Sequence, residues 1–471
     1  MPPVDTNSGL TATLAHQRAA FLRDGPPTLA ERRRDLLKLK DAILARQEEF
    51  VAALNADFGH RSQQETVLLD LGSTVDTIKY LHSNLRRWMR AERRSTAMVF
   101  FPGSNRVVYQ PLGVIGIVSP WNYPVSLALT PLATALAAGN RAMLKPSEMT
   151  PATSGLLASM LADIFEQDQV TVVTGDAKVG SAFSALPFDH ILFTGSIPVG
   201  RAVMRAASEN LVPVTLELGG KSPAIVERGS PLSTAAHRIA YGKLANGGQT
   251  CVAPDYALVP KEEIDNFVAS FKEEVAKLYP DIGADPDYTW IINDHHFARL
   301  SGLVEDARAK GARVIKIGTR PAGTSQSRLF LPTLLLNVTD EMDVMKDEIF
   351  GPILPIVPYR ALEDAVAYVN ARPRPLALYF FGPDGPGRRL VLDRTTSGNV
   401  VINDTILHYA QDDLPFGGVG MSGMGAYHGP EGFKTLSHAK GVYQQPRFNV
   451  AEGVRPPFGK FFDFLAYFIM R

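Results

Sequence analysis

The sequence predicts an α/β protein with a doubly wound domain, a second α/β domain and a small β arm. Short β-rich runs alternate with helical stretches, as in Val114–Val118, Ala142–Lys145 and His190–Phe193, and this alternation is typical of a parallel sheet. The pattern starts again after Lys221, which predicts the second domain. Ligands of doubly wound sheets gather at the carboxyl ends of the strands, so the turns after these runs are the first places to search for a site.

The helices and the remaining strands follow from local spacing. From about Leu10 to Asn55, apolar residues recur at helical intervals. The arginine-rich run Arg86–Arg94 reads as a solvated face, and Gly318–Ser327 reads as a surface loop. The second half predicts further strands and helices at Ala224–Val226, Tyr256–Val259, Ile264–Leu278, His296–Lys310, Arg313–Ile317, Ile353–Tyr359 and Val400–Asn403.

The composition excludes several classes of protein. Hydrophobic residues make up 45% and charged residues 20% of the 471, and the 48 basic residues balance 48 acidic ones, so nothing predicts a nucleic-acid partner. A single cysteine excludes a disulfide scaffold or a cysteine-rich metal site and favours a reducing compartment. Met1–Gly9 lacks the apolar core of a secretory signal, and no apolar run reaches the roughly 18–20 residues of a membrane span. A cytoplasmic protein without a transmembrane segment is predicted.

The only cysteine, Cys251, lies in the segment Asn246–Asp255. A free cysteine is commonly a small buried hydrophobe. However, Asn-Gly-Gly before it and Ala-Pro-Asp after it predict a tight, backbone-exposed loop. The N–H groups of such a loop could stabilise a thiolate, which makes Cys251 the candidate nucleophile.

Two strand ends are candidates for binding a nucleotide. At Phe193–Gly200 a strand ends, small residues turn the chain and a helix begins near Val199, so a helix N-terminus is available for a pyrophosphate. Lys145–Glu148 offers a cation and a carboxylate suited to ribose hydroxyls, although Ser147 and Glu148 could instead cap a helix.

Three other motifs fail on their context. Gly418–Gly423 matches G-x-G-x-x-G but does not follow a strand. Gly219–Ser222 echoes a phosphate loop, but Thr215 occupies the position of the required first glycine. Asp294–His296 has no partner at metal-ligand spacing, so no metal site is expected.

The collinear order of these motifs resembles that of aldehyde dehydrogenases over nearly the whole chain. The turn Ser422–Gly429 and the cysteine segment are similar to the class 3 and fatty-aldehyde branch, and Pro286–Thr289 with Ala307–Val314 is most similar to bacterial coniferyl aldehyde dehydrogenases. The matching motifs are Pro120–Pro124, Lys145–Glu148, Phe193–Ser196, Glu217–Lys221, Gly248–Cys251, Glu348–Pro352 and Pro415–Gly418.

The resemblance implies NAD(P)-dependent oxidation of an aldehyde to its acid, with an aromatic substrate such as coniferyl aldehyde or a medium- to long-chain aliphatic one. Cys251 attacks the carbonyl to give a thiohemiacetal and then a thioester. The Asn122 amide and the Cys251 backbone N–H hold the oxyanion, and Glu217 activates the hydrolytic water. From the residues alone, an ion pair between Glu217 and Lys221 is an equal alternative.

The resemblance also implies the cofactor site. Lys145 and Glu148 approach the adenosine ribose, Glu348 the nicotinamide ribose and Phe350 the nicotinamide. Glu148 favours NAD because it repels a 2′-phosphate, while NADP stays possible, and Pro198 removes one backbone donor from the phosphate turn. The expected cofactor residues are Ser119, Trp121, Lys145, Ser147, Glu148, Gly175, Gly195, Ser196, Ile197, Pro198, Val199, Gly200, Leu218, Gly219, Glu348 and Phe350.

The predicted organisation has four parts. A Rossmann-like NAD(P)-binding domain covers residues 1–85 and 110–216, a catalytic domain covers 217–403, oligomerisation segments cover 86–109 and 404–445, and a tail covers 446–471. Ala97–Tyr109 and Lys434–Gln444 read as extended strands that need covering; the resemblance implies that they form an oligomerisation arm, and the likeness to class 3 implies a homodimer. The tail is predicted to be a helix docked on the body through Phe461, Phe464, Leu465 and Phe468. A lid over the substrate entrance and a helix lying in a membrane surface are the alternatives, although only Lys460 and Arg471 could bind anionic lipid.

Two other functions stay open at this stage. A CoA-acylating relative would pass the acyl group to a thiol instead of water, and such relatives usually lack the base that Glu217 supplies here. A non-catalytic protein on the same fold would be expected to lack Cys251, Asn122 or Glu217, and all three residues are present.

Overall fold

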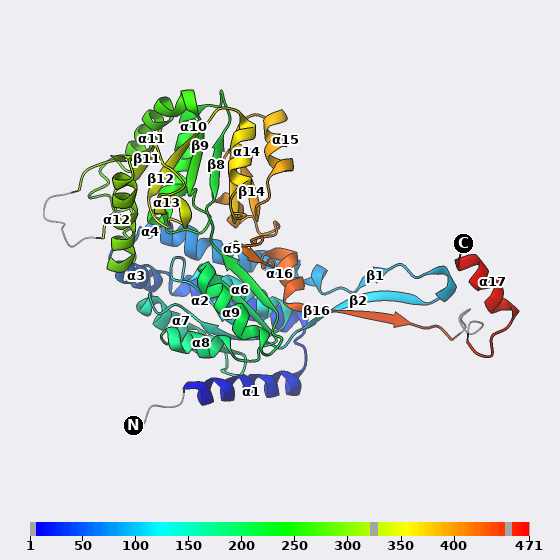
Figure 1. Cartoon of the computed structure of the whole chain (residues 1–471). Coiled ribbons are helices and arrows are strands. Elements are labelled where there is room, and N and C mark those ends of the chain that lie inside the picture. The colour runs from blue at the N-terminus through cyan, green and yellow to red at the C-terminus, as the bar shows by residue number, and fades with distance from the viewer. Residues whose placement is uncertain (1–5, 321–327, 448–454, 471) are drawn as a thin grey trace.

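The computed structural model describes residues 6–320, 328–447 and 455–470. Two open α/β sheets form the body, and a thin three-stranded arm projects from it (Figure 1). The predicted fold class is therefore confirmed. Among the described residues, no helix is long and apolar enough to cross a membrane.

The first sheet has six strands in the order β15-β7-β6-β3-β4-β5. Every pair is parallel except β15 with β7, which is antiparallel. Its central strands are buried on both faces, as expected for a parallel sheet covered by helices. The strands are β3 (Val114–Val118), β4 (Arg141–Lys145), β5 (Val170–Val172), β6 (His190–Gly195), β7 (Val214–Leu218) and β15 (Gly423–Met424).

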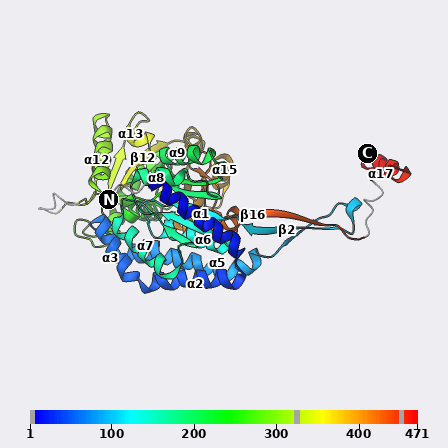
Figure 2. The same ribbon diagram turned by 90° about the horizontal axis from the view of Figure 1, so that it is seen from below.

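Helices from both ends of the chain cover this sheet, and Figure 2 shows many of them from below. The central helix α6 is buried along its whole length, and Leu129 on it joins Leu36, Phe50 and Ile78 of the N-terminal helices in one core. The N-terminal set is α1 (Thr6–Asp24), α2 (Leu29–Ala45), α3 (Gln47–Phe58), α4 (Gln63–Glu65), the π-helical η1 (Thr66–Gly72) and α5 (Ser73–Trp88). The others are α6 (Ser126–Ala138), α7 (Pro151–Ile164), α8 (Ala177–Ser184), α9 (Ile197–Ser208) and α16 (Gly429–Thr435).

The second sheet has seven strands in the order β10-β11-β12-β9-β8-β13-β14, and only β10 runs antiparallel to its neighbour. Its strands are β8 (Pro223–Val226), β9 (Tyr256–Pro260), β10 (Arg313–Lys316), β11 (Thr333–Leu336), β12 (Ile353–Tyr359), β13 (Ala377–Phe381) and β14 (Asn399–Ile402). The helices of this half are α10 (Leu232–Leu244), α11 (Ile264–Leu278), α12 (Asp294–Ala309), α13 (Asp343–Lys346), α14 (Leu362–Asn370) and α15 (Pro386–Arg394).

The arm consists of β1 (Glu92–Arg94), β2 (Ser104–Pro111) and β16 (Ser437–Gln444). β16 pairs antiparallel with β2 over eight residues, from Ser437 opposite Pro111 to Gln444 opposite Ser104. The prediction of two extended segments is right for these strands. It is wrong at their ends, because Met98–Phe100 forms a 3₁₀ turn and Lys434 belongs to α16.

The tail forms the predicted helix, α17 (Lys460–Ile469), but the predicted docking on the body is wrong. α17 lies beyond the far end of the arm (Figure 1). Phe464 and Phe468, two residues of the predicted buried face, are 67% and 72% exposed. The helical spacing of apolar residues predicted the helix, but it contained no information about the position of that helix relative to the body.

Smaller deviations concern element ends. α9 begins at Ile197 instead of near Val199, with Pro198 in its first turn, where a missing N–H costs no helical hydrogen bond. The expected domain limit at residue 217 falls inside β7. Residues 321–327 of the predicted surface loop lie outside the described residues.

Candidate active site

Cys251 follows a turn in which three consecutive residues have left-handed backbone conformation. Asn246, Gly247 and Gly248 have φ values of 53°, 62° and 76°. A Cβ on Gly248 would lie 2.5 Å from the backbone of Gly351, and one on Gly247 would lie 2.8 Å from the Thr289 carbonyl. The turn is therefore tight, as predicted, but the prediction of an exposed backbone is wrong, because residues 245–250 are buried.

The Cys251 side chain is partly exposed at the end of this buried turn. Burial, and next the negative charges of Glu348 and Glu217, raise the pKa of its thiol to about 12. The backbone N–H groups of Cys251 and Val252 act in the opposite direction, because they donate toward the sulfur. The resting group is a thiol, and a nucleophile forms only when the site takes its proton away.

Glu217 is placed on β7 and its carboxylate is buried. Among the described residues, neither carboxylate oxygen has a hydrogen-bond partner, and burial raises the pKa of this group well above its ordinary value. The alternative ion pair with Lys221 is not formed, because Lys221 binds Asp255 and two backbone carbonyls instead. An unpartnered carboxyl beside a thiol can accept a proton from water or from sulfur.

The rejected G-x-G-x-x-G motif has a packing role beside Glu217. Gly423 pairs with Glu217 across the sheet edge, and the backbone N–H of Leu218 donates to the Ser422 carbonyl at 3.1 Å. A Cβ on Gly423 would lie 2.1 Å from the Leu216 carbonyl oxygen. The glycines therefore allow close approach of this turn to β7.

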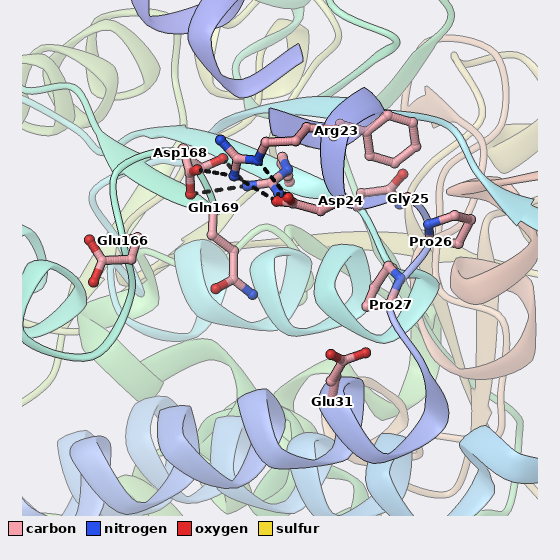
Figure 3. Close-up of a pocket in the computed structure, with 13 residues that line it drawn as sticks. Arg23, Asp24, Gly25, Pro26, Pro27, Glu31, Glu166, Asp168 and Gln169 are labelled. Carbon is pink, nitrogen blue, oxygen red and sulfur yellow. Dashed lines mark hydrogen bonds and ion pairs between the residues drawn. The ribbon is translucent and has the colours of Figure 1, made fainter. Parts of the chain in front are cut away.

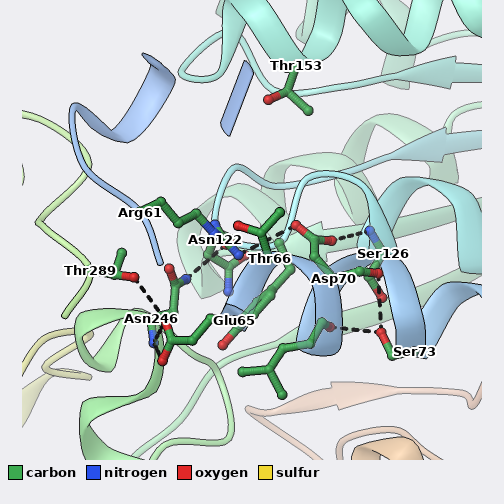
Figure 4. Close-up of polar contacts among 12 residues, drawn as sticks. Arg61, Glu65, Thr66, Asp70, Ser73, Asn122, Ser126, Thr153, Asn246 and Thr289 are labelled. Atoms are coloured by element: carbon green, nitrogen blue, oxygen red, sulfur yellow. Dashed lines mark hydrogen bonds and ion pairs between the residues drawn. The ribbon is translucent and has the colours of Figure 1, made fainter. Parts of the chain in front are cut away.

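Asn122 lies after β3 and faces the nucleophile turn. Its side-chain amide donates to the Gln249 carbonyl at 3.1 Å, which uses one of its two N–H groups. Its own backbone carbonyl accepts from Arg61 Nη1 at 2.8 Å and from Asn246 Nδ2 at 2.9 Å. Figure 4 shows Asn122 between Arg61 and Asn246. The structure thus brings Asn122 to the turn that carries Cys251, as the predicted oxyanion site requires.

An aromatic cluster lies near Cys251, which interacts electrostatically with the Tyr409 and Tyr427 hydroxyls. Tyr409 and Phe416 pack against the same core as the cysteine, and the Tyr409 and Tyr427 hydroxyls lie 3.4 Å apart. The ring of His428 stacks on Phe416 at 5.0 Å. The surroundings of Cys251 on this side are therefore largely aromatic and apolar.

The comparisons with known proteins agree with this geometry. The model of the aldehyde dehydrogenase family matches residues 6–442. The chain belongs to the aldehyde dehydrogenase family. It is 53% identical over 458 residues to a probable coniferyl aldehyde dehydrogenase of Pseudomonas aeruginosa, covering 97% of this chain and 95% of the relative. It is 49% identical to the coniferyl aldehyde dehydrogenase of a Pseudomonas species, covering 96% and 94%.

Solved structures give the same assignment. The substrate-bound state of AldH from Staphylococcus aureus superposes with a TM-score of 0.92 at 37% identity, covering 97% of this chain and 99% of that one. An aldehyde dehydrogenase of Mycobacterium tuberculosis complexed with NAD⁺ superposes with a TM-score of 0.84 at 31% identity, covering 93% and 90%. The protein is thus an NAD(P)-dependent aldehyde dehydrogenase.

The phosphate side of this aldehyde dehydrogenase fits a dinucleotide. β6 ends at Gly195, and α9 begins two residues later. Its N-cap Ser196 makes no side-chain capping bond, so the first N–H groups of the helix stay available for an anion. A Cβ on Gly200 would lie 2.6 Å from Leu218, so glycine at this position allows α9 to pack close to β7. Val199, in the first turn of α9, is 51% exposed.

Two buried hydroxyls support the same fit. Ser119 Oγ, after β3, and Thr194 Oγ1, at the end of β6, are buried and have no partner among the described residues. Both lie at carboxyl ends of strands, where a bound nucleotide would supply the missing contacts. Gly175, with φ of +149°, would place a Cβ 2.5 Å from Val179, so this turn accepts only glycine.

The two residues expected to bind the adenosine ribose, Lys145 and Glu148, form an ion pair. Lys145 is buried at the end of β4, and its Nζ lies 2.9 Å from Glu148 Oε2. Ser147 Oγ accepts from the Met149 backbone N–H. The capping alternative is wrong, because α7 begins only at Pro151, with Thr150 as its N-cap.

On the expected nicotinamide side, four of the predicted residues form two contacting pairs. The Glu348 carboxylate lies against Gly219, where a Cβ would be 1.9 Å from Glu348 Oε2. Burial, together with the charge of Asp255, raises the pKa of Glu348 to about 8. Phe350 takes a left-handed φ of 52°, and its ring lies 5.3 Å from that of Trp121.

A cavity of about 330 Å³ lies elsewhere, between the end of α1 and the sheet (Figure 3). Arg23 and Arg141 in its wall both pair with Asp24 and Asp168. None of the predicted site residues lines it, and both arginines are already paired with carboxylates of the same wall. Among the described residues, no group of three or more His, Cys, Asp or Glu could hold a metal ion.

Sequence reasoning missed the residues that hold the nucleophile turn. Arg61 and Glu65 contact Asn122 and Asn246 from a segment about 60 and 180 residues earlier in the chain. Thr289, which donates to Glu65, was likewise not predicted as a site residue. Nothing in their local sequence marks them, because a buried polar contact depends on tertiary placement.

Proposed function

We propose that this enzyme oxidises an aromatic aldehyde of the coniferyl type to its carboxylic acid with NAD. The observation that carries the proposal is the convergence of Cys251, Asn122 and an unpartnered Glu217 near an aromatic cluster. The names of the two Pseudomonas relatives support the substrate class. A medium- or long-chain aliphatic aldehyde would suit the same apolar surroundings and is the second candidate.

The first step forms a bond between Cys251 Sγ and the aldehyde carbon, and the thiol proton passes to Glu217 or to water. Negative charge develops on the carbonyl oxygen. The second N–H of the Asn122 amide and the backbone N–H of Cys251 are the donors for that charge, and one such donor is typically worth about 3–4 kcal/mol.

A nicotinamide cofactor held by Glu348 and Phe350 would supply the hydride acceptor that takes up the two electrons of the oxidation. Glu217, after any proton from the thiol has passed to solvent, removes a proton from water, and the resulting hydroxide adds to the thioester carbon. The C–S bond then breaks, and Glu217 returns its proton to the departing sulfur, so that the acid and the thiol are released. Burial raises the pKa of Glu217, so its carboxylate, once ionised, is a stronger proton acceptor than an ordinary exposed glutamate.

A preference for NAD rests on Glu148. Its carboxylate is held by Lys145 at the place where the adenosine ribose is expected. The carboxylate would accept hydrogen bonds from ribose hydroxyls and repel a 2′-phosphate. Because the Glu148 side chain is 42% exposed, solvent screens that repulsion, and NADP is a weaker second cofactor.

We also propose a cytoplasmic homodimer. The long strand β16 and the exposed aromatic residues of α17 protrude from the body (Figure 1), and unpaired edges and apolar patches of this kind are normally covered. Light scattering at micromolar concentration should give twice the chain mass of 51.3 kDa. A stable monomer would contradict this assembly.

A substrate panel tests the activity. Purified enzyme should form NADH faster with cinnamyl-type aldehydes than with short aliphatic ones, without added CoA, and the acid should appear in equal amount. A requirement for CoA would point to the acylating alternative. Absence of NADH with every aldehyde tested would contradict the proposed function.

A further inference from the structure

Glu65 lies beside the nucleophile turn although the proposed chemistry does not use it. It ends the short helix α4, and Ser62, the N-cap of that helix, accepts from the Glu65 backbone N–H at 3.1 Å. The π-helical segment η1 follows directly, and such segments often occur at functional sites. The Glu65 side chain is therefore presented from a backbone that is itself fixed.

The carboxylate of Glu65 accepts three hydrogen-bond contacts from two residues. Its Oε1 and Oε2 lie 3.1 and 3.0 Å from the backbone N of Asn246. Oε2 also accepts from Thr289 Oγ1 at 2.9 Å. Figure 4 shows Glu65 between these two partners. Both oxygens are thus directed at the first residue of the left-handed turn.

Asn246 is the residue in this turn whose conformation most needs support. A non-glycine residue at φ of 53° is uncommon, and glycine would be the ordinary choice. Its side chain explains why it is asparagine, because Nδ2 donates both to the Asn122 carbonyl and to the Gln249 carbonyl. The turn therefore needs a side chain in a conformation that side chains disfavour, and Glu65 holds the backbone N–H of that residue.

We propose that Glu65 is a positioning residue that sets the direction of Cys251 by holding Asn246 in the left-handed conformation. Asn246 connects the two groups that must meet the aldehyde: Cys251 follows it by five residues, and its side chain binds the backbone of Asn122. Loss of the Glu65 contact should release the turn, so that Cys251 is no longer held at a fixed place relative to Asn122, whose amide binds the same turn. This inference rests on the proposed function only for its catalytic consequence.

The single cysteine makes a direct test possible, since iodoacetamide can alkylate no other thiol in the chain. Two substitutions separate reach from charge. Glu65→Gln keeps the length of the side chain, and its carbonyl oxygen can still accept from Asn246 while its amide donates to the Thr289 hydroxyl. Glu65→Asp keeps the charge but withdraws the carboxylate by one methylene. Glu48→Asp, at an exposed glutamate of α3, is the matched control.

In the full-length enzyme, the alkylation rate of Cys251 and the rate of the first NADH burst should both fall about tenfold in Glu65→Asp. Both rates should stay within about threefold of wild type in Glu65→Gln and be unchanged in Glu48→Asp. NAD affinity should be equal in all four proteins, so that a general loss of structure is recognised. Glu65→Asp rates within twofold of wild type, or equal defects in the Gln and Asp variants, would overturn the inference.

A second variant keeps the test open if Glu65→Asp does not fold. Thr289→Val removes the hydroxyl that holds Glu65 Oε2 and leaves Glu65 in place. It should lower the alkylation rate about threefold while the circular dichroism spectrum stays unaltered, and an unchanged rate would contradict the proposal. Failure of the proposed function is recognised separately, because activity in Cys251→Ala would refute the nucleophile while the alkylation comparison at Glu65 stayed valid.

Discussion

The nucleophile turn and the strand end at Glu217 differ in how their buried polar groups are hydrogen-bonded. Asn246 and Gln249 are held by several hydrogen bonds each, and the turn sits in buried surroundings. Glu217, equally buried, has neither carboxylate oxygen bonded among the described residues. The turn that must direct Cys251 is held by hydrogen bonds, whereas the Glu217 carboxylate, which must exchange a proton, has none from the described part of the chain. Stability and proton transfer thus make different demands within one site.

Replacing Cys251 by alanine should have the largest effect. The thiol supplies the covalent route, so aldehyde oxidation should fall at least about 10³-fold while NAD binding stays near wild type. Initial rates of NADH formation and a binding titration of NAD on the same sample would show this. Retention of a substantial part of wild-type turnover would mean that the clamped turn serves another purpose.

Glu217→Gln should separate the two half-reactions. The amide cannot accept the proton of water, so the variant should release one equivalent of NADH quickly and then turn over about 100-fold more slowly. Stopped-flow absorbance measures both phases. Loss of the burst itself would show that Glu217 takes the thiol proton in acylation and that its two proposed uses are not separable.

The same substitution should change how stability depends on pH. Burial raises the folded-state pKa of Glu217 above the unfolded value, so the folded protein holds this proton more tightly. Its contribution is fully present below the unfolded pKa, near 4.5, and is lost as pH rises through the folded pKa, at up to about 1.4 kcal/mol per pH unit. Glu217→Gln should therefore gain stability relative to wild type with rising pH in denaturant titrations. A difference that is constant between pH 5 and 9 would contradict this.

Glu148→Gln should have a moderate effect on cofactor choice. Removing the charge at the ribose site should raise kcat/KM with NADP about fivefold, because one exposed charge contributes about 1 kcal/mol. Kinetics with NAD should weaken slightly as one acceptor for the ribose hydroxyls is changed. Glu166→Gln, elsewhere on the same half, is a suitable control, and equal NADP kinetics in both variants would argue against the ribose assignment.

Deleting Pro457–Arg471 should have the smallest effect on chemistry. α17 lies beyond the far end of the arm, away from the two-sheet body of its own chain (Figure 1). The alkylation rate of Cys251 and kcat for small aldehydes should stay within about twofold of wild type, while the exposed apolar surface, read by a hydrophobic dye, should fall. A raised KM or a changed chain-length preference would show that the tail reaches a substrate entrance, as a partner chain would allow.

Sequence reasoning located the parts that local pattern encodes. Alternating strands and helices gave the parallel sheets, and α11 spans the predicted Ile264–Leu278. Motifs at strand ends led to Cys251, Asn122 and Glu217, which the structure brings together. Contacts between residues far apart in the sequence could not be predicted, since nothing in the sequence around Glu65 indicates that it binds Asn246. The position of α17 escaped for a related reason: periodicity predicts a helix and an apolar face, but not the surface that the chain brings near it.

The pairing of β16 with β2 has a consequence for biosynthesis. More than 300 residues separate the two strands in the chain, and a ribosome adds about 5–20 residues per second. For roughly 15 seconds to a minute, a nascent chain therefore carries β2 with one edge open, paired only with the three residues of β1. The antiparallel edge strand of the first sheet, β15, also arrives late, at residues 423–424. Completion of both the arm and the first sheet thus waits for the end of translation, so chains that terminate early expose unpaired strand edges of the kind that favour aggregation.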